Sequence, residues 1–232
     1  MKEYIIFGAG DYLNDIFDLI HANQGKVIKL FQNIPDIKRE GRLTIQNRVS
    51  RLEYEIEIHD SLTPFQPEQE YHYVLGFIAV HKSRLIAELK EQYGITFSRL
   101  IHPGAHVSSN VHIGEGVIIG PLSSIGPNAF LDDFCSINRS ASIGHDVRIG
   151  KYTRVGPSVA LAGSTRIGDN CNVGINATVL DYVKVGNWAV IGAGSVVAKD
   201  LPESVVAYGV PAKIVRANED QDFATYRAKR SF

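Results

Sequence analysis

One histidine is surrounded by residues that carry little chemistry of their own. His145 lies in the segment SINRSASIGHDVRIGKYTRVG, residues 136–156, among small and aliphatic residues. A neutral imidazole near pH 7 can take a proton from an attacking amine or hydroxyl, and the adjacent Asp146 can hold the ring in one tautomer. The alternative is a polar turn residue on an exposed corner. The choice between them depends on the elements that position His145.

Those elements follow a six-residue period. From Val107 to Val197 every sixth residue is a branched aliphatic, over sixteen positions without a slip. A helix would need a period of 3.6 and a plain strand a period of 2. A period of six is the signature of a hexapeptide β-helix, so residues 101–200 are expected to form about five and a half coils.

Two further positions of each hexapeptide have a fixed character. The residue after the aliphatic is usually glycine, which we expect to accommodate tight backbone geometry at each corner. The residue four places after the aliphatic is small or β-branched and is expected to point inward. Cys135 and Cys171 occupy this position, which predicts that they are core residues and not nucleophiles.

The repeat brings distant residues together. Three hexapeptides close one coil, so residues 18 apart stack at roughly 4.8 Å. Gly163 follows His145 by one full coil and lies at the same corner. The backbone N–H of Gly163 is therefore expected near an oxyanion that forms beside the imidazole. Asp181 shares that corner two coils from His145 and is interpreted as a solvated residue.

Residues 1–100, at the start of the chain, lack this period, and their pattern predicts a small α/β domain. Residues 3–31 predict a strand, a Gly8-Ala9-Gly10 turn, a helix and a second strand, the opening of a parallel sheet. Asp11 is expected in the helix N-cap region. Residues 71–79 predict a buried strand, and residues 81–94 a helix closed by glycine.

The Gly-rich turn has three interpretations. A phosphate of a sugar nucleotide at the helix N-terminus is favoured, a packing turn without a ligand is the alternative, and a nicotinamide cofactor is disfavoured. The turn lacks the third glycine of a dinucleotide fingerprint, and Gln32 and Asn33 stand where an acidic ribose ligand would follow the second strand.

Composition excludes several function classes. The net charge of -1 gives no support for a nucleic-acid surface, and no apolar stretch reaches the ~18 residues of a membrane span. The N-terminus lacks the apolar core of a signal peptide, so we expect a cytoplasmic protein. His102, His106 and His112 fall on different corners, and no metal is expected.

Several motifs together resemble a known family. The Gly-rich first turn, LIHPGAHVS entering the coils, GHDVRIG in their middle and AYGVPAKIV closing them resemble the NeuD/PglD-type sugar acyltransferases of the hexapeptide superfamily. The resemblance implies a left-handed parallel β-helix, a homotrimer and acetyl-CoA bound between neighbouring coils. It divides the chain into an acceptor domain (1–100), a catalytic β-helix domain (101–216) and a tail (217–232).

The resemblance also assigns roles. It implies that His145 is the general base, that Asp146 orients it, that Asn138 matches the family's asparagine and that the Gly163 N–H faces the thioester carbonyl. Arg154 stands where some members have a second histidine. The implied CoA contacts are Ile175, Gly192, Ala193 and Gly194, and the implied acceptor contacts are Gly8, Ala9, Gly10, Gln32 and Asn33.

The expected function is direct transfer of an acetyl group from acetyl-CoA to the amino group of a nucleotide-linked amino sugar, in surface glycan biosynthesis. The alternative is a sugar O-acetyltransferase acting on a sialic-acid-like hydroxyl acceptor. A third, less favoured hypothesis is a non-catalytic β-helix that binds sugars or serves as a scaffold.

Overall fold

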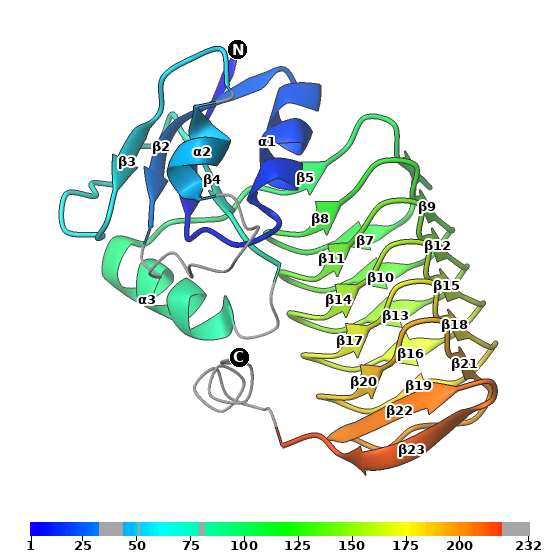
Figure 1. Cartoon of the computed structure of the whole chain (residues 1–232). Helices are drawn as coiled ribbons and strands as arrows, with labels where there is room; N and C mark the ends of the chain where they lie inside the picture. The colour runs from blue at the N-terminus through cyan, green and yellow to red at the C-terminus, as the bar shows by residue number, and fades with distance from the viewer. Residues whose placement is uncertain (33–43, 51, 79–81, 220–232) are drawn as a thin grey trace. The chain divides into compact units, whose positions relative to one another are not determined.

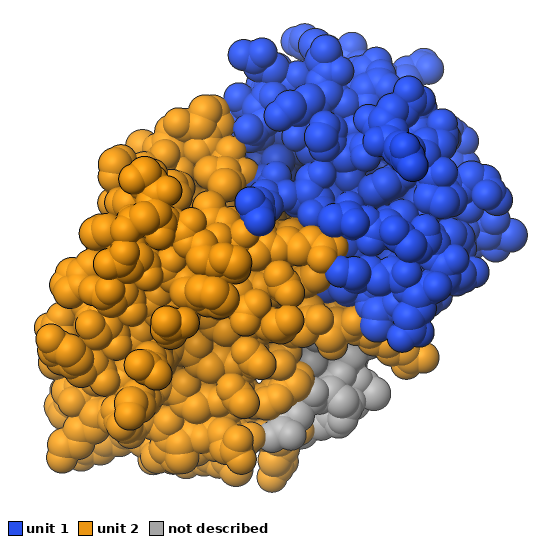
Figure 2. All heavy atoms as spheres, turned by 180° about the vertical axis from the view of Figure 1, so that it is seen from behind, with its two compact units in different colours: residues 1–78, 86–100 blue, residues 79–85, 101–232 orange. Residues whose placement is uncertain are grey.

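The chain forms two compact units in a computed structural model that describes residues 1–32, 44–50, 52–78 and 82–219. The first unit comprises Met1–Ile78 and Ile86–Leu100, and the second Ala79–Leu85 and Ile101–Phe232 (Figure 2). None of the described helices is long and apolar enough to cross a membrane.

The first unit is built on a parallel sheet, as predicted. Its strands pair in the order β3-β2-β1-β4 (Figure 1). The sheet strands are β1 (Lys2–Phe7), β2 (Gly25–Phe31), β3 (Glu57–His59) and β4 (His72–Leu75), and the helices are α1 (Leu13–Ala22), α2 (Ile45–Val49) and α3 (Ser83–Tyr93). Helix α1 buries Ile16, Leu19 and Ile20, and Gly94 follows α3 with a φ of 63°.

Asp11 lies in the N-cap region of α1, directly before the N-cap residue Tyr12, but no side chain makes a capping hydrogen bond at this end of the helix. Asp11 instead lies beside Arg48, whose Nη1 donates to the Asp11 carbonyl at 3.4 Å, while the carboxylate lies 3.9 Å from Nη2. The Arg48 side chain is buried, and a buried guanidinium needs such acceptors.

The second unit is a left-handed parallel β-helix in which three two-residue strands form each coil (Figure 1). We call its sheets B, C and D. Sheet B contains β5 (Leu100–Ile101), β8 (Ile118–Ile119), β11 (Ser136–Ile137), β14 (Arg154–Val155), β17 (Asn172–Val173), β20 (Val190–Ile191), β22 (Val205–Gly209) and β23 (Ala212–Ala217). Sheet C contains β6 (His106–Val107), β9 (Ser124–Ile125), β12 (Ser142–Ile143), β15 (Ala160–Leu161), β18 (Thr178–Val179) and β21 (Val196–Val197). Sheet D contains β7 (His112–Ile113), β10 (Phe130–Leu131), β13 (Arg148–Ile149), β16 (Arg166–Ile167) and β19 (Lys184–Val185).

The predicted register and core are confirmed. From β6 to β21 each strand pairs with the strand 18 residues away, for example Ser142 with Ala160, whereas β22 pairs with β20 at an offset of 16 residues. The repeated aliphatics and the small residues four places on fill the interior. Cys135 and Cys171 are buried free cysteines, and burial raises the pKa of each thiol to about 12. They belong to the core.

The role predicted for the repeated glycines needs correction. These glycines do not carry the positive φ of the turns, which falls two residues later, mostly on non-glycine residues such as Asn128, Asp146 and Tyr182. The glycines are required because successive coils approach closely. A Cβ on Gly126 would lie 2.8 Å from the backbone nitrogen of His145.

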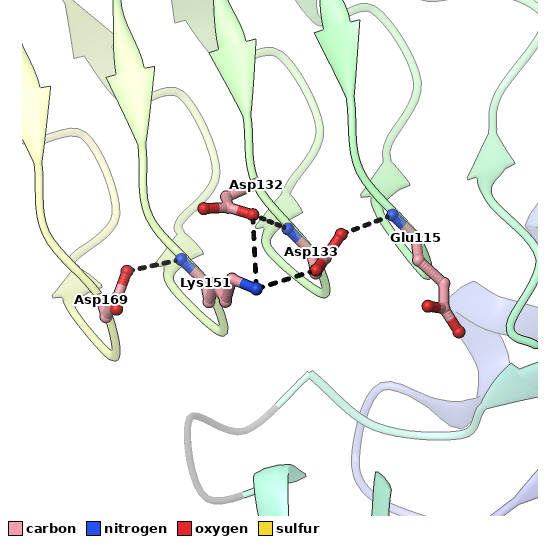
Figure 3. A network of polar contacts seen from close by, with 5 residues as sticks. All are labelled: Glu115, Asp132, Asp133, Lys151 and Asp169. Atoms are coloured by element: carbon pink, nitrogen blue, oxygen red, sulfur yellow. Dashed lines mark hydrogen bonds and ion pairs between the residues drawn. The ribbon is translucent and has the colours of Figure 1, made fainter. Parts of the chain in front are cut away.

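Polar side chains tie the coils together at the corner between sheets D and B (Figure 3). Asp133 Oδ1 accepts from the backbone N–H of Glu115, and Asp169 Oδ1 accepts in the same way from Lys151. The Lys151 ammonium lies 3.0 Å from Asp133 and 4.0 Å from Asp132. These bonds run from one coil to the next and fix the spacing of the corners. Of the tail expected at 217–232, residues 220–232 lie outside the described residues.

Candidate active site

His145 lies at the corner between sheets C and D, in the turn from β12 to β13. Its side chain is 60 % exposed, and Nδ1 lies 2.7 Å from Asp146 Oδ2. This contact identifies Nδ1 as the protonated nitrogen, which donates to the carboxylate. The Nε2 lone pair is then available to accept a proton. Within this turn Asp146 adopts a φ of 60°.

Gly163, one coil further along, lies directly beneath the imidazole. A Cβ at this position would lie 2.6 Å from His145 Nε2, so any larger residue would displace the ring. Among the described residues, no hydrogen bond occupies the Gly163 N–H, whereas its carbonyl accepts from Tyr182. An N–H donor next to the basic nitrogen is the arrangement that acyl transfer needs. The structure therefore brings together three of the residues predicted from the sequence.

A short chain of amides supports Asp146. Asn128 lies one coil before Asp146, and Asn110 lies one coil before Asn128. Asn110 and Asn128 exchange hydrogen bonds, and the side chain of Asn128 also bonds to the Asp146 carboxylate. The bond with His145 and then the bond with Asn128 lower the pKa of Asp146. Asp146 is thus held as a carboxylate. Sequence reasoning missed Asn128; its signal was an asparagine 18 residues before Asp146 at the same turn position.

The other residues predicted to act in the catalytic domain lie at a different corner, between sheets B and C. Asn138 is buried, and its Oδ1 accepts from the Arg139 N–H. Ile175 is half exposed, and its carbonyl accepts from the Gly194 N–H. Gly192 lies under β22, where a Cβ would come within 2.6 Å of the Tyr208 Cβ. Ala193 and Gly194 are exposed beside Ile175.

One chain therefore does not unite all the predicted residues. The strand order within a coil is B, C, D, so the corner that carries His145 lies opposite sheet B. Asn138 and Ile175 follow strands of sheet B and lie at another corner of the same coils. A site that used both corners would need two copies of the chain.

The Gly-rich turn of the first unit is closely packed. Gly8 has a φ of 72°, and its N–H donates to Phe31, while the Gly10 N–H donates to Gly76. A Cβ on Gly10 would lie 2.9 Å from the Phe77 Cβ. These glycines thus have a packing role, and two of the N–H groups expected to face a phosphate are already bonded.

The remaining predicted acceptor residues add little to the site. The Gln32 N–H donates to His59, Ala9 lies between the two glycines, and Asn33 falls outside the described residues. In the part of the chain that the structure describes, no group of three His, Cys, Asp or Glu side chains is placed to hold a metal ion.

Comparisons with known proteins agree with this fold. Residues 164–199 match the family described as bacterial transferase hexapeptide (six repeats). PerB from Caulobacter crescentus, solved with CoA and GDP-perosamine, superposes with a TM-score of 0.79 and 28% identity, over 93% of this chain and 98% of that one. The acetyltransferase domain of PglB from Neisseria gonorrhoeae, solved with acetyl coenzyme A, gives 0.78 and 23% identity over 92% and 99% of the two chains.

A curated relative matches over a shorter stretch. Galactoside O-acetyltransferase of Lactococcus lactis is 52% identical over 44 residues, which is 19% of this chain and 21% of that protein. The match thus spans about a fifth of that relative's length. The hexapeptide coils, the superposition over nearly the whole chain and the match over residues 164–199 show that this chain is similar to the hexapeptide-repeat acyltransferases.

Proposed function

We propose that the protein transfers an acetyl group from acetyl-CoA to the amino group of a nucleotide-linked amino sugar. The observation that carries the proposal is the position of His145, with Nδ1 on Asp146 and Nε2 over Gly163. The perosamine N-acetyltransferase of Caulobacter crescentus, solved with CoA and GDP-perosamine, aligns over nearly the whole chain and supports the choice of acceptor. A place in surface glycan biosynthesis is part of this proposal.

Each residue then has a defined task. Acetyl-CoA supplies the acetyl group already activated as a thioester. His145 accepts the proton of the attacking nitrogen at Nε2, and Asp146 stabilises the imidazolium that results. The Gly163 N–H donates to the carbonyl oxygen as negative charge develops there. The proton held at Nε2 can then pass to the departing thiolate sulfur, which regenerates the neutral base.

The separation of the two corners supports a homotrimer with its sites between chains. In that arrangement His145 of one copy meets Asn138, Ile175, Ala193 and Gly194 of its neighbour, and CoA lies in the cleft between them. A closed cyclic assembly would build three equivalent sites from one kind of contact. Gly8, Ala9, Gly10, Gln32 and Asn33 remain proposed acceptor contacts.

A sugar O-acetyltransferase is the second candidate, favoured by the local identity to galactoside O-acetyltransferase. The base and the oxyanion donor would serve a hydroxyl acceptor equally well. Release of free thiol from acetyl-CoA, measured with nucleotide-linked amino sugars and with plain sugars, separates the two. Turnover with an amino sugar supports the first candidate, whereas turnover with hydroxyl acceptors alone supports the second.

A further inference from the structure

Two cationic side chains and a hydroxyl meet on sheet B without an anion. Lys82, Ser136 and Arg154 all belong to the second unit, and Ser136 pairs in register with Arg154 on the neighbouring strand. Lys82 is 1 % exposed and Ser136 is 2 % exposed. Lys82 lies close enough to Arg154 for the two like charges to interact. We call these three residues the Lys82 cluster.

Two hydrogen-bonding atoms of this cluster are unsatisfied. Ser136 Oγ and Arg154 Nε are both buried, and neither has a hydrogen-bond partner in the described part of the chain. Buried polar groups in native proteins are nearly always bonded, and buried charges are nearly always paired. Two adjacent orphaned groups beside a buried ammonium therefore indicate a missing acceptor.

No carboxylate of the protein fills that role among the described residues. The groups that act on Lys82 are Cys135, a buried thiol, and the cation Arg154. The nearest acids to Cys135 are Asp132 and Asp133, and both face the ammonium of Lys151. Burial, with a further contribution from Arg154, lowers the pKa of Lys82 to about 8. The cluster has an excess of donors and positive charge.

We propose that Lys82, Ser136 and Arg154 bind the oxyanion group of a substrate, a carboxylate or a phosphate. A guanidinium, an ammonium and a hydroxyl are the donors that such groups prefer. The assignment of this anion to the acceptor substrate rests on the proposed function. It is made because Arg154 lies on sheet B, and Asn138 lies at the corner where sheet B meets sheet C. The binding itself does not depend on that function.

Thermal unfolding of the whole protein with added inorganic phosphate or acetate, at constant ionic strength in chloride, tests the site. A ligand that binds only the folded state raises Tm with its concentration. We expect phosphate or acetate to raise the Tm of the wild type by a few degrees. The anion that gives the larger increase identifies the substrate group as a phosphate or a carboxylate. Arg154→Met is expected to lose this increase. Arg166→Met is the matched control, since Arg166 is also the first residue of a two-residue strand but lies exposed on sheet D.

Two further variants keep the test decisive if Arg154→Met folds poorly. Ser136→Ala retains both charges. It should need roughly threefold to tenfold more oxyanion to reach the same rise in Tm, as expected for one lost hydrogen bond. Arg154→Lys retains the charge but loses Nε, and is expected to show an intermediate response. In chloride alone, Arg154→Met should have a higher Tm than the wild type, because it removes one of two neighbouring cations.

The outcomes separate this inference from the proposed function. Equal responses in the wild type, Arg154→Met and Arg166→Met, or no response in any of them, would overturn the site. His145→Ala should keep the full response, since it lies at another corner. If an acceptor is turned over, Arg154→Met should raise its KM at least tenfold and leave the KM of acetyl-CoA unchanged; a loss confined to kcat would contradict substrate binding here.

Discussion

At the residue scale, the proposed mechanism depends on one nitrogen atom. The Nε2 of His145 is basic and directed over Gly163 because Nδ1 is held by Asp146 at 2.7 Å. Asp146 can hold it only as a carboxylate, and its lowered pKa maintains that state at neutral pH. The imidazole, the carboxylate and the amide of Asn128 therefore act as a chain.

Asn128→Gly tests the supporting amide. Glycine tolerates the φ of 59° at this turn, so the change removes the amide without backbone strain. We expect kcat/KM to fall by about threefold to tenfold, the range for a single lost hydrogen bond. Asn170→Gly, at the same turn position of another corner, is the control and should be close to wild type.

Asn128→Asp changes the charge as well. A second carboxylate beside Asp146 raises the pKa of Asp146 and favours the imidazolium form of His145. The acid limb of the pH profile of kcat/KM should therefore move to higher pH. An unchanged profile would show that Asn128 does not act through Asp146.

Lys82 makes a prediction about stability and pH. Its pKa is about 8 in the folded protein and 10.5 for an unperturbed lysine, so above pH 8 the unfolded chain binds more protons. From pH 8 to 9 Lys82 raises the free energy of unfolding by about 1 kcal/mol in buffers without oxyanions. The thiols of Cys135 and Cys171, whose pKa values are raised to about 12, act in the opposite direction over the same range and offset roughly 0.7 kcal/mol of that rise. Chemical denaturation should therefore show a nearly level free energy of unfolding in the wild type and a fall of about 0.7 kcal/mol in Lys82→Met.

At the scale of elements, substitutions at two glycines distinguish an effect on catalysis from an effect on folding. A Cβ on Gly163 meets the movable ring of His145, whereas a Cβ on Gly150 lies 2.6 Å from the backbone of Gly168 on the next coil. Gly163→Ala should keep its Tm and lose kcat by roughly 100-fold, because the base is displaced.

Gly150→Ala should be destabilised by about 1–3 kcal/mol and keep its activity per folded molecule. Denaturant unfolding and thiol release, measured on both variants, check the pair. The reverse pattern would contradict the placement of His145 over Gly163.

The coils were predictable from the sequence because each repeat position is set by local packing. The aliphatic period gave the register, and the register gave the stacking of His145 and Gly163. The turns were less readable, since a positive φ on Leu122 or Tyr182 is imposed by the coil and not by the residue type. Lys82 could not be predicted, because its position on sheet B depends on contacts between segments far apart in the sequence.

At the scale of the whole molecule, the two corners predict complementation between chains. His145→Ala removes one corner and Ala193→Trp blocks the other, so each variant alone should be inactive. Refolding them together in equal amounts would leave roughly one interface in four with both corners intact. We expect about a quarter of the wild-type activity in the mixture, and a mixture as inactive as its parts would place the site within a single chain.

The most direct test of the central claim is the release of free thiol from acetyl-CoA by the wild type and by His145→Ala. The panel should contain UDP-, GDP- and dTDP-linked 4-amino sugars with their hydroxyl counterparts. The account predicts turnover with an amino sugar in the wild type and a loss of 10²- to 10⁴-fold in the variant, as expected for a missing general base. Turnover that persists undiminished in His145→Ala would contradict it.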